Sequence, residues 1–293
     1  MKKIFTLSVL VLAINLFLTA CGNSKEKNND NLTIVASFYT MYDFANKIAG
    51  DKVNVINLMP SGTEVHDWEP STKDMYSMEN ADIVVYNGAG MESWVDKVKD
   101  SLSSDSTVFL ETTKDIQISE NHDPHVWLDP MLAKIQMKAI LDALCNVDPE
   151  NSLYYNDNYE KYSVQLDELN TAYEEAASKF SKHEIIVAHE AYGYLCSAYG
   201  ITQIGIDGLS SHNEPSPVRM SEIIEIGKEK NIEYIFYDEM ESKKTAEIVA
   251  EEVGANIEIL TSIETLTTEN EQNGDDYFSL MYANLEKLKA ALS

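Results

Sequence analysis

Three histidines and one glutamate occupy segments of the chain that could present metal ligands. His66 and His125 lie in the first half of the sequence, and His189 and Glu264 lie in the second half. Three imidazole nitrogens and one carboxylate form a complete tetrahedral shell for a borderline-soft divalent cation. We therefore predict a metal centre built from these four side chains and located between two lobes of the protein.

The neighbours of the first two histidines place them on loops next to regular structure. His66 stands in the segment PSGTEVHDWEP (60–70), which separates an expected strand from an expected helix. His125 stands shortly before Asp129-Pro130, a pair that favours a helix start because Asp caps a helix and Pro is accepted in its first turn. Parallel α/β sheets present their ligands on such loops.

His189 and Glu264 follow expected strands of the second half. The dipeptide His189-Glu190 resembles the start of the metalloprotease motif H-E-x-x-H, but Gly193 occupies the position of its second histidine. A shell closed by four protein ligands also leaves no position for an activated water, which favours binding over catalysis. His122 is expected at the surface, with an accessory contact to an incoming cation as the alternative.

Further side chains could orient the histidine rings by hydrogen bonds to their second nitrogen atoms. By position alone, the candidates are Glu69, Asp129, Ser210 and Glu239.

Short β-branched runs alternate with helical patterns, which is typical of parallel sheets with crossover helices. Strands are predicted at 32–37, 53–59, 83–87 and 108–111, and again at 184–188, 202–206, 234–238 and 257–260. Helices should follow them, and those of the second half are predicted to begin near residues 192, 218, 243 and 276. The predicted fold class is α/β, with two lobes that each contain a mainly parallel four-stranded sheet and flanking helices.

One long amphipathic helix is predicted between the lobes. From Pro149 to Lys182 the chain contains no glycine and no further proline, and its apolar residues recur at steps of three and four. A helix of some 30 residues spans roughly 45 Å, long enough to reach across two lobes. The predicted domains are an N-terminal lobe (32–148), a rigid linking helix (149–182) and a C-terminal lobe (183–293).

The first residues have the layout of a secretory leader. Lys2 and Lys3 precede an apolar run that is too short for a convincing membrane-spanning helix, so a signal peptide is predicted at 1–20. The small residues before Cys21 resemble a lipobox, in which cleavage leaves a lipidated cysteine as the new N-terminus. The alternative is an ordinary signal peptide with a chance cysteine. Residues 21–31 are predicted to be a lipidated, disordered tether, because residues 22–31 offer no apolar side chain to bury.

The composition restricts the possible partners. The chain carries 22 basic and 49 acidic side chains and a formal net charge of −27, which excludes nucleic acid and favours cation capture. Arg219 is the only arginine, which argues against a clamp for phosphate or carboxylate groups. Cys145 and Cys196 lie in helix-like apolar stretches and are expected to be buried free thiols.

Together these segments resemble the cluster A-I metal-binding proteins of bacterial ABC importers, a family of zinc and manganese receptors that includes streptococcal zinc-binding and laminin-binding-type lipoproteins. The resemblance extends from Leu32 to the C-terminus. It rests on H-x-x-E-P at 66–70, D-P-H-x-W-L-D-P at 123–130, H-x-x-Y-G-Y-L at 189–195, EPSP at 214–217 and GDDYFSLM at 274–281. His66, His125 and His189 match the three histidine positions of the family. Glu264 matches its C-terminal acidic position, which is Glu or Asp among relatives.

The resemblance implies an extracytoplasmic, lipid-anchored, monomeric receptor that captures Zn²⁺ and delivers it to an ABC-type permease and its ATPase. The donor set favours zinc, because manganese prefers more oxygen ligands, and a manganese receptor is one alternative. The histidine-rich loop that many zinc members carry before the second motif is missing here. Two alternatives from other classes are a secreted zinc hydrolase, with water as fourth ligand and Glu264 as base, and a surface adhesin.

Overall fold

The computed structural model describes residues 32–102, 106–209, 215–240 and 242–293. The predicted signal peptide, the tether with Cys21, and Ser210 lie outside these residues. Leu32–Ser293 forms one compact unit. No helix within the described ranges is both long and apolar enough to cross a membrane.

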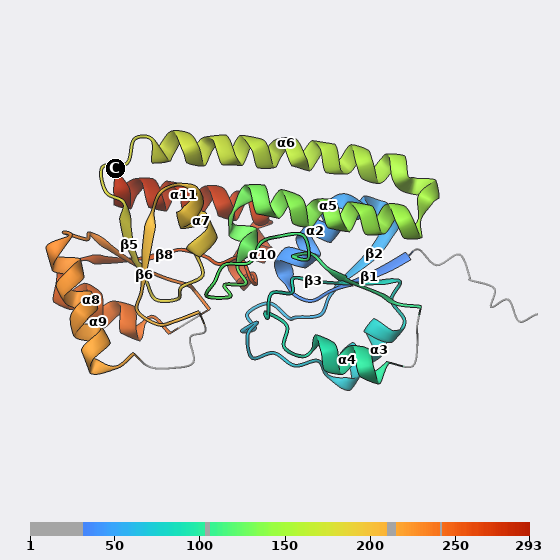
Figure 1. The fold of residues 1–293 in the computed structure, drawn as a ribbon, viewed down its shortest axis with the longest axis horizontal. Helices are drawn as coiled ribbons and strands as arrows, with labels where there is room; N and C mark the ends of the chain where they lie inside the picture. The colour runs from blue at the N-terminus through green and yellow to red at the C-terminus, as the bar shows by residue number, and fades with distance from the viewer. Residues whose placement is uncertain (1–31, 103–105, 210–214, 241) are drawn as a thin grey trace, which may run out of the picture. The chain divides into compact units, whose positions relative to one another are not determined.

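The N-terminal lobe is built on a parallel sheet of four strands in the order β2-β1-β3-β4 (Figure 1). Its strands are β1 (Leu32–Ala36), β2 (Val53–Asn57), β3 (Ile83–Tyr86) and β4 (Val108–Glu111). Its helices are α2 (Tyr39–Ala49), α3 (Thr72–Glu79), α4 (Val95–Ser101) and α5 (Pro130–Val147). The central strand β3 reads Ile-Val-Val-Tyr and is buried along its whole length, as expected for a parallel strand with helices on both faces.

The C-terminal lobe repeats this arrangement with the order β6-β5-β7-β8, again entirely parallel. Its strands are β5 (Glu184–Val187), β6 (Thr202–Gly205), β7 (Tyr234–Tyr237) and β8 (Asn256–Ile259). Its helices are α7 (Gly193–Ala198), α8 (Pro217–Glu229), α9 (Lys244–Val253), α10 (Thr268–Asn273) and α11 (Tyr277–Leu292). In sheets of this kind ligands bind beyond the carboxyl ends of the strands.

The predicted fold class is confirmed. Each predicted strand is present, and the ends differ from the predicted ones by at most two residues. Asp129 caps α5 as expected, since its side chain accepts a hydrogen bond from the Met131 amide. The short helix α10 was not predicted.

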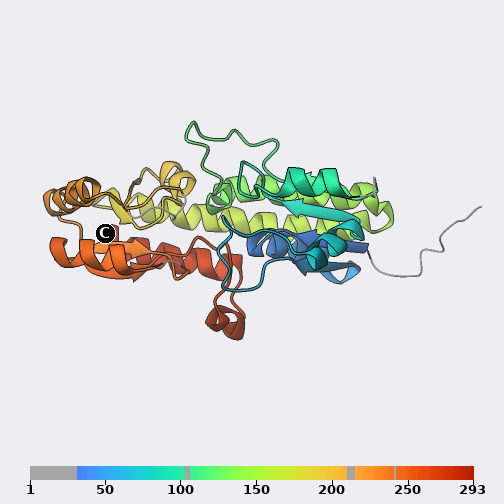
Figure 2. The same cartoon turned by 90° about the horizontal axis from the view of Figure 1, so that it is seen from below.

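The predicted linking helix is α6 (Ser152–Ala177), preceded by a 3-10 turn at Pro149–Asn151. Figure 1 shows α6 along one side of the molecule, above α5 and α11, and Figure 2 shows the two lobes side by side along it. The helix ends before the predicted Lys182. The Lys179 and Phe180 amides donate to the Ala176 and Ala177 carbonyls in a tighter turn, and the Ser181 and Lys182 amides then donate to the Leu292 carbonyl at the end of α11. The lobe boundaries at 148 and 183 remain a prediction.

A single apolar core continues through both lobes beneath α6. It contains large buried side chains from both halves, among them Phe44, Trp127, Tyr173 and Tyr277. Smaller cores lie under α3 and α4 in one lobe and under α8 and α9 in the other. Cys196 is a buried free thiol as predicted, whereas Cys145 is free and only half-buried. The shared core makes the joint between the lobes stiff, since movement of one lobe against the other would expose apolar surface to water.

Candidate metal centre

The four predicted side chains lie together where the two lobes meet. One potential ligand atom from each of His66, His125, His189 and Glu264 lies within 4.8 Å of all the others. The three imidazole centroids are 4.9 to 5.5 Å apart. Glu264 Oε1 lies 3.1 Å from His125 Nε2 and 3.9 Å from His66 Nε2. The chain therefore brings together side chains that follow strands of both sheets.

His66 is held by its neighbours in the loop between β2 and α3. Val65 is buried, and the Trp68 ring packs edge-on against Trp94 at 5.6 Å. The His66 amide donates to Glu64 Oε1 at 3.1 Å. The His66 side chain is 11% exposed, whereas that of His125 is fully buried. His66 is therefore more accessible to solvent than His125.

His125 is oriented by Asp123. One carboxylate oxygen, Asp123 Oδ1, lies 2.7 Å from His125 Nδ1 and accepts the His125 amide at 2.9 Å. Because a carboxylate can only accept, the proton of the neutral ring stands on Nδ1 and the lone pair on Nε2. Two residues later, Trp127 Nε1 donates to the Ser262 carbonyl at 2.7 Å, which ties this loop to the one carrying Glu264.

His189 follows β5 directly and is anchored in the C-terminal sheet. The preceding amide, that of Ala188, donates to the Phe236 carbonyl at 2.7 Å. His189 Nε2 lies 3.0 Å from the Leu209 carbonyl, which can only accept a hydrogen bond. This contact selects the tautomer with the proton on Nε2 and the lone pair on Nδ1.

Glu264 lies in a strained loop after β8. The preceding residue, Ile263, is fully buried and has φ +60°, a left-handed conformation that is unfavourable for a β-branched side chain. The Thr40 hydroxyl donates to the Ile263 carbonyl, and the Tyr39 amide donates to the Glu264 carbonyl at 3.2 Å. These contacts hold the loop in a conformation that its sequence alone would not prefer.

The electrostatics of the cluster favour an ionised carboxylate. Burial alone would raise the pKa of Glu264, but the nearby imidazoles of His125, His189 and His66 outweigh burial and hold the pKa at about 2. Burial lowers the pKa of His125, yet the carboxylates of Asp123 and Glu264 outweigh this effect and raise the pKa above its usual value.

The arrangement fits a divalent cation. His125 Nε2 and Glu264 Oε1 are both buried, and neither has a hydrogen-bond partner in the described part of the chain. Such atoms are costly to bury unless another group satisfies them. Zinc bonds of ~2.1 Å place tetrahedral ligand atoms about 3.4 Å apart. The distances of 3.1 and 3.9 Å from Glu264 Oε1 already lie close to this value, whereas a pair near the 4.8 Å limit would have to close by roughly 1.4 Å.

Two groups that accept hydrogen bonds from the imidazole rings were not predicted from the sequence. Asp123 had a detectable signal, since it stands two residues before His125 in an Asp-Pro-His motif. The Leu209 carbonyl had no sequence signal, because every residue carries a backbone carbonyl.

The three expected orienting residues that the structure describes have other roles or positions. Glu69 pairs with Lys97 at 3.7 Å, Asp129 caps α5, and Glu239 is exposed. His122 is exposed, as predicted.

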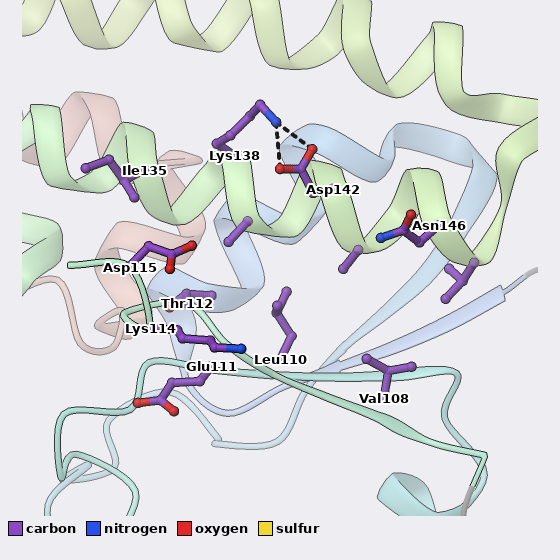
Figure 3. Close-up of a pocket in the computed structure, with 13 residues that line it drawn as sticks. Val108, Leu110, Glu111, Thr112, Lys114, Asp115, Ile135, Lys138, Asp142 and Asn146 are labelled. Carbon is purple, nitrogen blue, oxygen red and sulfur yellow. Dashed lines mark hydrogen bonds and ion pairs between the residues drawn. The ribbon is translucent and has the colours of Figure 1, made fainter.

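A separate hollow lies between β4 and α5 (Figure 3). It has a volume of about 450 Å³, an apolar floor that includes Val108 and Leu110, and the Lys138–Asp142 ion pair at its rim. None of the four clustered side chains lines it. The hollow is therefore distinct from the metal centre.

Known proteins resemble this chain in sequence and in structure. The family described as zinc-uptake complex component A, periplasmic, matches residues 34–291. The high-affinity zinc uptake system protein ZnuA of Bacillus subtilis (strain 168) is 37% identical over 306 residues, which cover 97% of this chain and 96% of that protein.

Two solved structures have the same fold. The metal-dependent lipoprotein YcdH from Bacillus subtilis has 39% identity and a TM-score of 0.82 over 89% of this chain and 99% of its own. The Zn(II)-bound ZnuA-like domain of Streptococcus pneumoniae AdcA has 35% identity and a TM-score of 0.81, with the same coverage of 89% and 99%. On these grounds the chain belongs to the family of periplasmic zinc-uptake component A proteins, which are solute-binding proteins rather than enzymes.

Proposed function

We propose that this protein is an extracytoplasmic receptor that binds Zn²⁺ through His66, His125, His189 and Glu264 and delivers it to an ABC-type permease and its ATPase. The observation that carries the proposal is the meeting of these four side chains, with ligand atoms within 4.8 Å of one another. The names of the relatives support it, because a ZnuA protein and a Zn(II)-bound domain have similar sequences.

Three neutral imidazoles and one ionised carboxylate would surround the cation. Zinc accepts nitrogen and oxygen donors in a tetrahedral shell, whereas manganese favours a shell richer in oxygen. Asp123 would add a second negative charge behind His125 and so reduce the cost of burying a doubly charged ion. A shell completed by four side chains would leave no site for an activated water.

The direct test is metal content. Protein purified without chelators should contain one equivalent of zinc, and Zn²⁺ should displace Mn²⁺ in a competition titration. His125→Ala should lose the bound zinc, because a buried ligand is removed. His183→Ala is a matched control, since this histidine is exposed and should be dispensable for metal binding.

Three results would contradict the proposal: wild-type protein without stoichiometric zinc, preferential binding of manganese, or zinc retained at full affinity by His125→Ala. Glu264→Ala separates a receptor from a hydrolase. The receptor should lose zinc affinity, whereas a hydrolase should keep its metal and lose turnover.

We also propose that residues 1–20 are removed and that Cys21 carries the lipid anchor. A similar solved structure is described as a lipoprotein, which supports this assignment. Cys21→Ala should move the protein from the membrane fraction to the soluble fraction and abolish the lipid mass. Cys145→Ala, the control, should stay with the membrane.

A further inference from the structure

The loop that carries Glu264 makes hydrogen bonds to both lobes. At Ser262 its partners change from the C-terminal lobe to the N-terminal lobe. Its amide donates to Asp238 Oδ2 of the C-terminal lobe at 2.6 Å, whereas its carbonyl accepts from Trp127 of the N-terminal lobe. The next two carbonyls, of Ile263 and Glu264, accept from Thr40 and Tyr39 of the N-terminal lobe. Glu264 is therefore fixed to the N-terminal lobe, although it follows a strand of the other sheet.

The segment with His189 is held by the C-terminal lobe. The Ala188 amide donates a hydrogen bond to Phe236 of β7, and the Glu190 amide donates to the Gly208 carbonyl at 3.2 Å. The His189 ring itself contacts the Leu209 carbonyl at 3.0 Å. The position of His189 relative to the other three side chains thus depends on how this segment meets the N-terminal lobe.

Tyr194 provides a polar contact between the His189 segment and the N-terminal lobe. It lies in α7, the helix that follows His189. Its hydroxyl accepts the Ser119 amide at 3.0 Å and lies 3.1 Å from the Asp123 carbonyl and 3.3 Å from Ser119 Oγ, so its proton can go to either acceptor. Asp123 is also the residue whose carboxylate orients His125.

The neighbouring Gly193 shows how closely the segments approach. A Cβ atom at this position would lie 2.4 Å from Asp123 Oδ2, closer than any ordinary contact. A glycine thus lets α7 pack directly against the carboxylate, and the Tyr194 hydroxyl lies beside this contact. The segments that carry His125 and His189 are joined through Asp123 and its neighbours.

We propose that Tyr194 is a positioning residue for zinc binding. Its hydroxyl holds the His189 segment against the Asp123–His125 segment, so that His189 shares the cation with the three side chains fixed to the N-terminal lobe. This inference rests on the proposed zinc-binding function. Loss of the hydroxyl should let the lobe with His189 withdraw more often and should speed zinc release.

The test compares Tyr194→Phe with Tyr199→Phe, a matched control at the other end of the same helix. The Tyr199 hydroxyl donates to Asn170 Oδ1 of α6 at 2.9 Å and touches neither ligand segment through this bond. Zinc dissociation into a chromophoric chelator and zinc association would be timed by stopped flow. The absorption spectrum of Co²⁺-loaded protein would report the ligand geometry, and thermal melting of the metal-free protein would report stability.

Tyr194→Phe should release zinc about five- to tenfold faster, as expected for the loss of one or two hydrogen bonds. The association rate should change by less than about twofold, because affinity changes within one site act mainly on dissociation. The Co²⁺ spectrum should shift in Tyr194→Phe and not in Tyr199→Phe. A merely structural role would lower the melting temperature of both variants and leave zinc release and the spectrum unchanged.

The outcomes separate the two proposals. Wild-type protein that binds no zinc would overturn the proposed function itself. Wild-type protein that binds zinc, together with a Tyr194→Phe variant that releases it at the wild-type rate, would overturn only the role of Tyr194. Equal acceleration in both variants would also overturn it, because the effect would then be general loosening of α7.

Discussion

The carboxylate of Asp123 contributes charge as well as orientation to His125. It accepts the ring Nδ1–H and the His125 amide, and both residues are buried. Asn at this position could still accept both hydrogen bonds but would remove the negative charge. Asp123→Asn should therefore weaken zinc binding by about 10- to 100-fold, the usual effect of losing such a partner. Competition with a chelator of known affinity measures the change.

Asp129→Asn is the control for this change. Asp129 caps α5, and Asn caps helices equally well, so zinc affinity should stay at the wild-type level. If Asp123→Asn binds zinc as tightly as the wild type, geometry alone explains the role of Asp123 and its charge does not matter.

The pKa values of the ligands predict how zinc binding depends on pH. The pKa of His125 is raised, and below it the imidazolium has no lone pair, so zinc must displace a proton. Affinity should be constant above this pKa and should fall as the pH drops below it. Glu264, with a pKa of about 2, stays ionised and adds no dependence near neutral pH. Titrations from about pH 8 to about pH 5.5 test this, and a constant affinity would contradict it.

At the scale of elements, the strands could be predicted because parallel strands need continuous β-branched or apolar runs. Runs such as Ile-Val-Val-Tyr at 83–86 satisfied this pattern, and turn residues marked their ends. Helix α10 could not be recognised, since its sequence Thr-Glu-Asn-Glu-Gln-Asn has no apolar face. The chain after α6 also could not be predicted, because the Ser181 and Lys182 amides donate to Leu292, a residue that is distant in sequence.

The site could be predicted in part for a similar physical reason. Histidines on loops after strands carry a chemical signal, so the four clustered residues were recognisable. Apart from Asp123, the groups that support them depend on side-chain directions and on backbone carbonyls, which have no sequence pattern. Asn87 is an example: it follows β3 and is fully buried, and its side chain donates to the Pro124 carbonyl at 3.0 Å.

Asn87 therefore links the end of β3 to the residue before His125. Its Oδ1 atom also accepts Gln136 Nε2 from α5 at 2.8 Å. Asn87→Ala would leave the Pro124 carbonyl and the Gln136 amide without these partners. The Pro124 carbonyl would still accept the Val126 amide, and Gln136 Nε2 would still donate to Thr112 Oγ1, so neither group loses its last partner. A net loss of about 0.5–1.5 kcal/mol for each of the two hydrogen bonds should lower the free energy of unfolding by about 1–3 kcal/mol. Zinc affinity should also fall, because the His125 loop loses a support.

Urea denaturation and zinc titration of Asn87→Ala measure the two effects. Asn158→Ala is the matched control, because Asn158 Nδ2 also donates to a backbone carbonyl, that of Ile48, away from the metal centre. This variant should lose some stability and keep its zinc affinity. If Asn87→Ala keeps wild-type zinc affinity, the His125 loop does not depend on this bond.

At the scale of the whole molecule, a charged cluster ties the lobes together beside α6. Lys47 of α2 lies 2.7 Å from Asp43 and 2.9 Å from Asp276, the residue that caps α11. Its ammonium group also lies 5.6 Å from the ring centroids of Tyr162 in α6 and Phe278 in α11. Burial lowers the pKa of Lys47, but the two carboxylates outweigh burial and raise it, so Lys47 is charged at neutral pH.

Lys47→Met tests whether this cluster holds the joint. The substitution would leave Asp43 as a buried carboxylate without its cation, and such losses cost about 3–5 kcal/mol. The control is Lys134→Met, which breaks the 2.7 Å pair between α5 and α6, in which the Asp167 side chain is 53% exposed. A pair of that kind contributes less than about 1 kcal/mol. Urea denaturation should therefore separate the two variants clearly. Equal losses of unfolding free energy in the two variants would show that the apolar core alone joins the lobes.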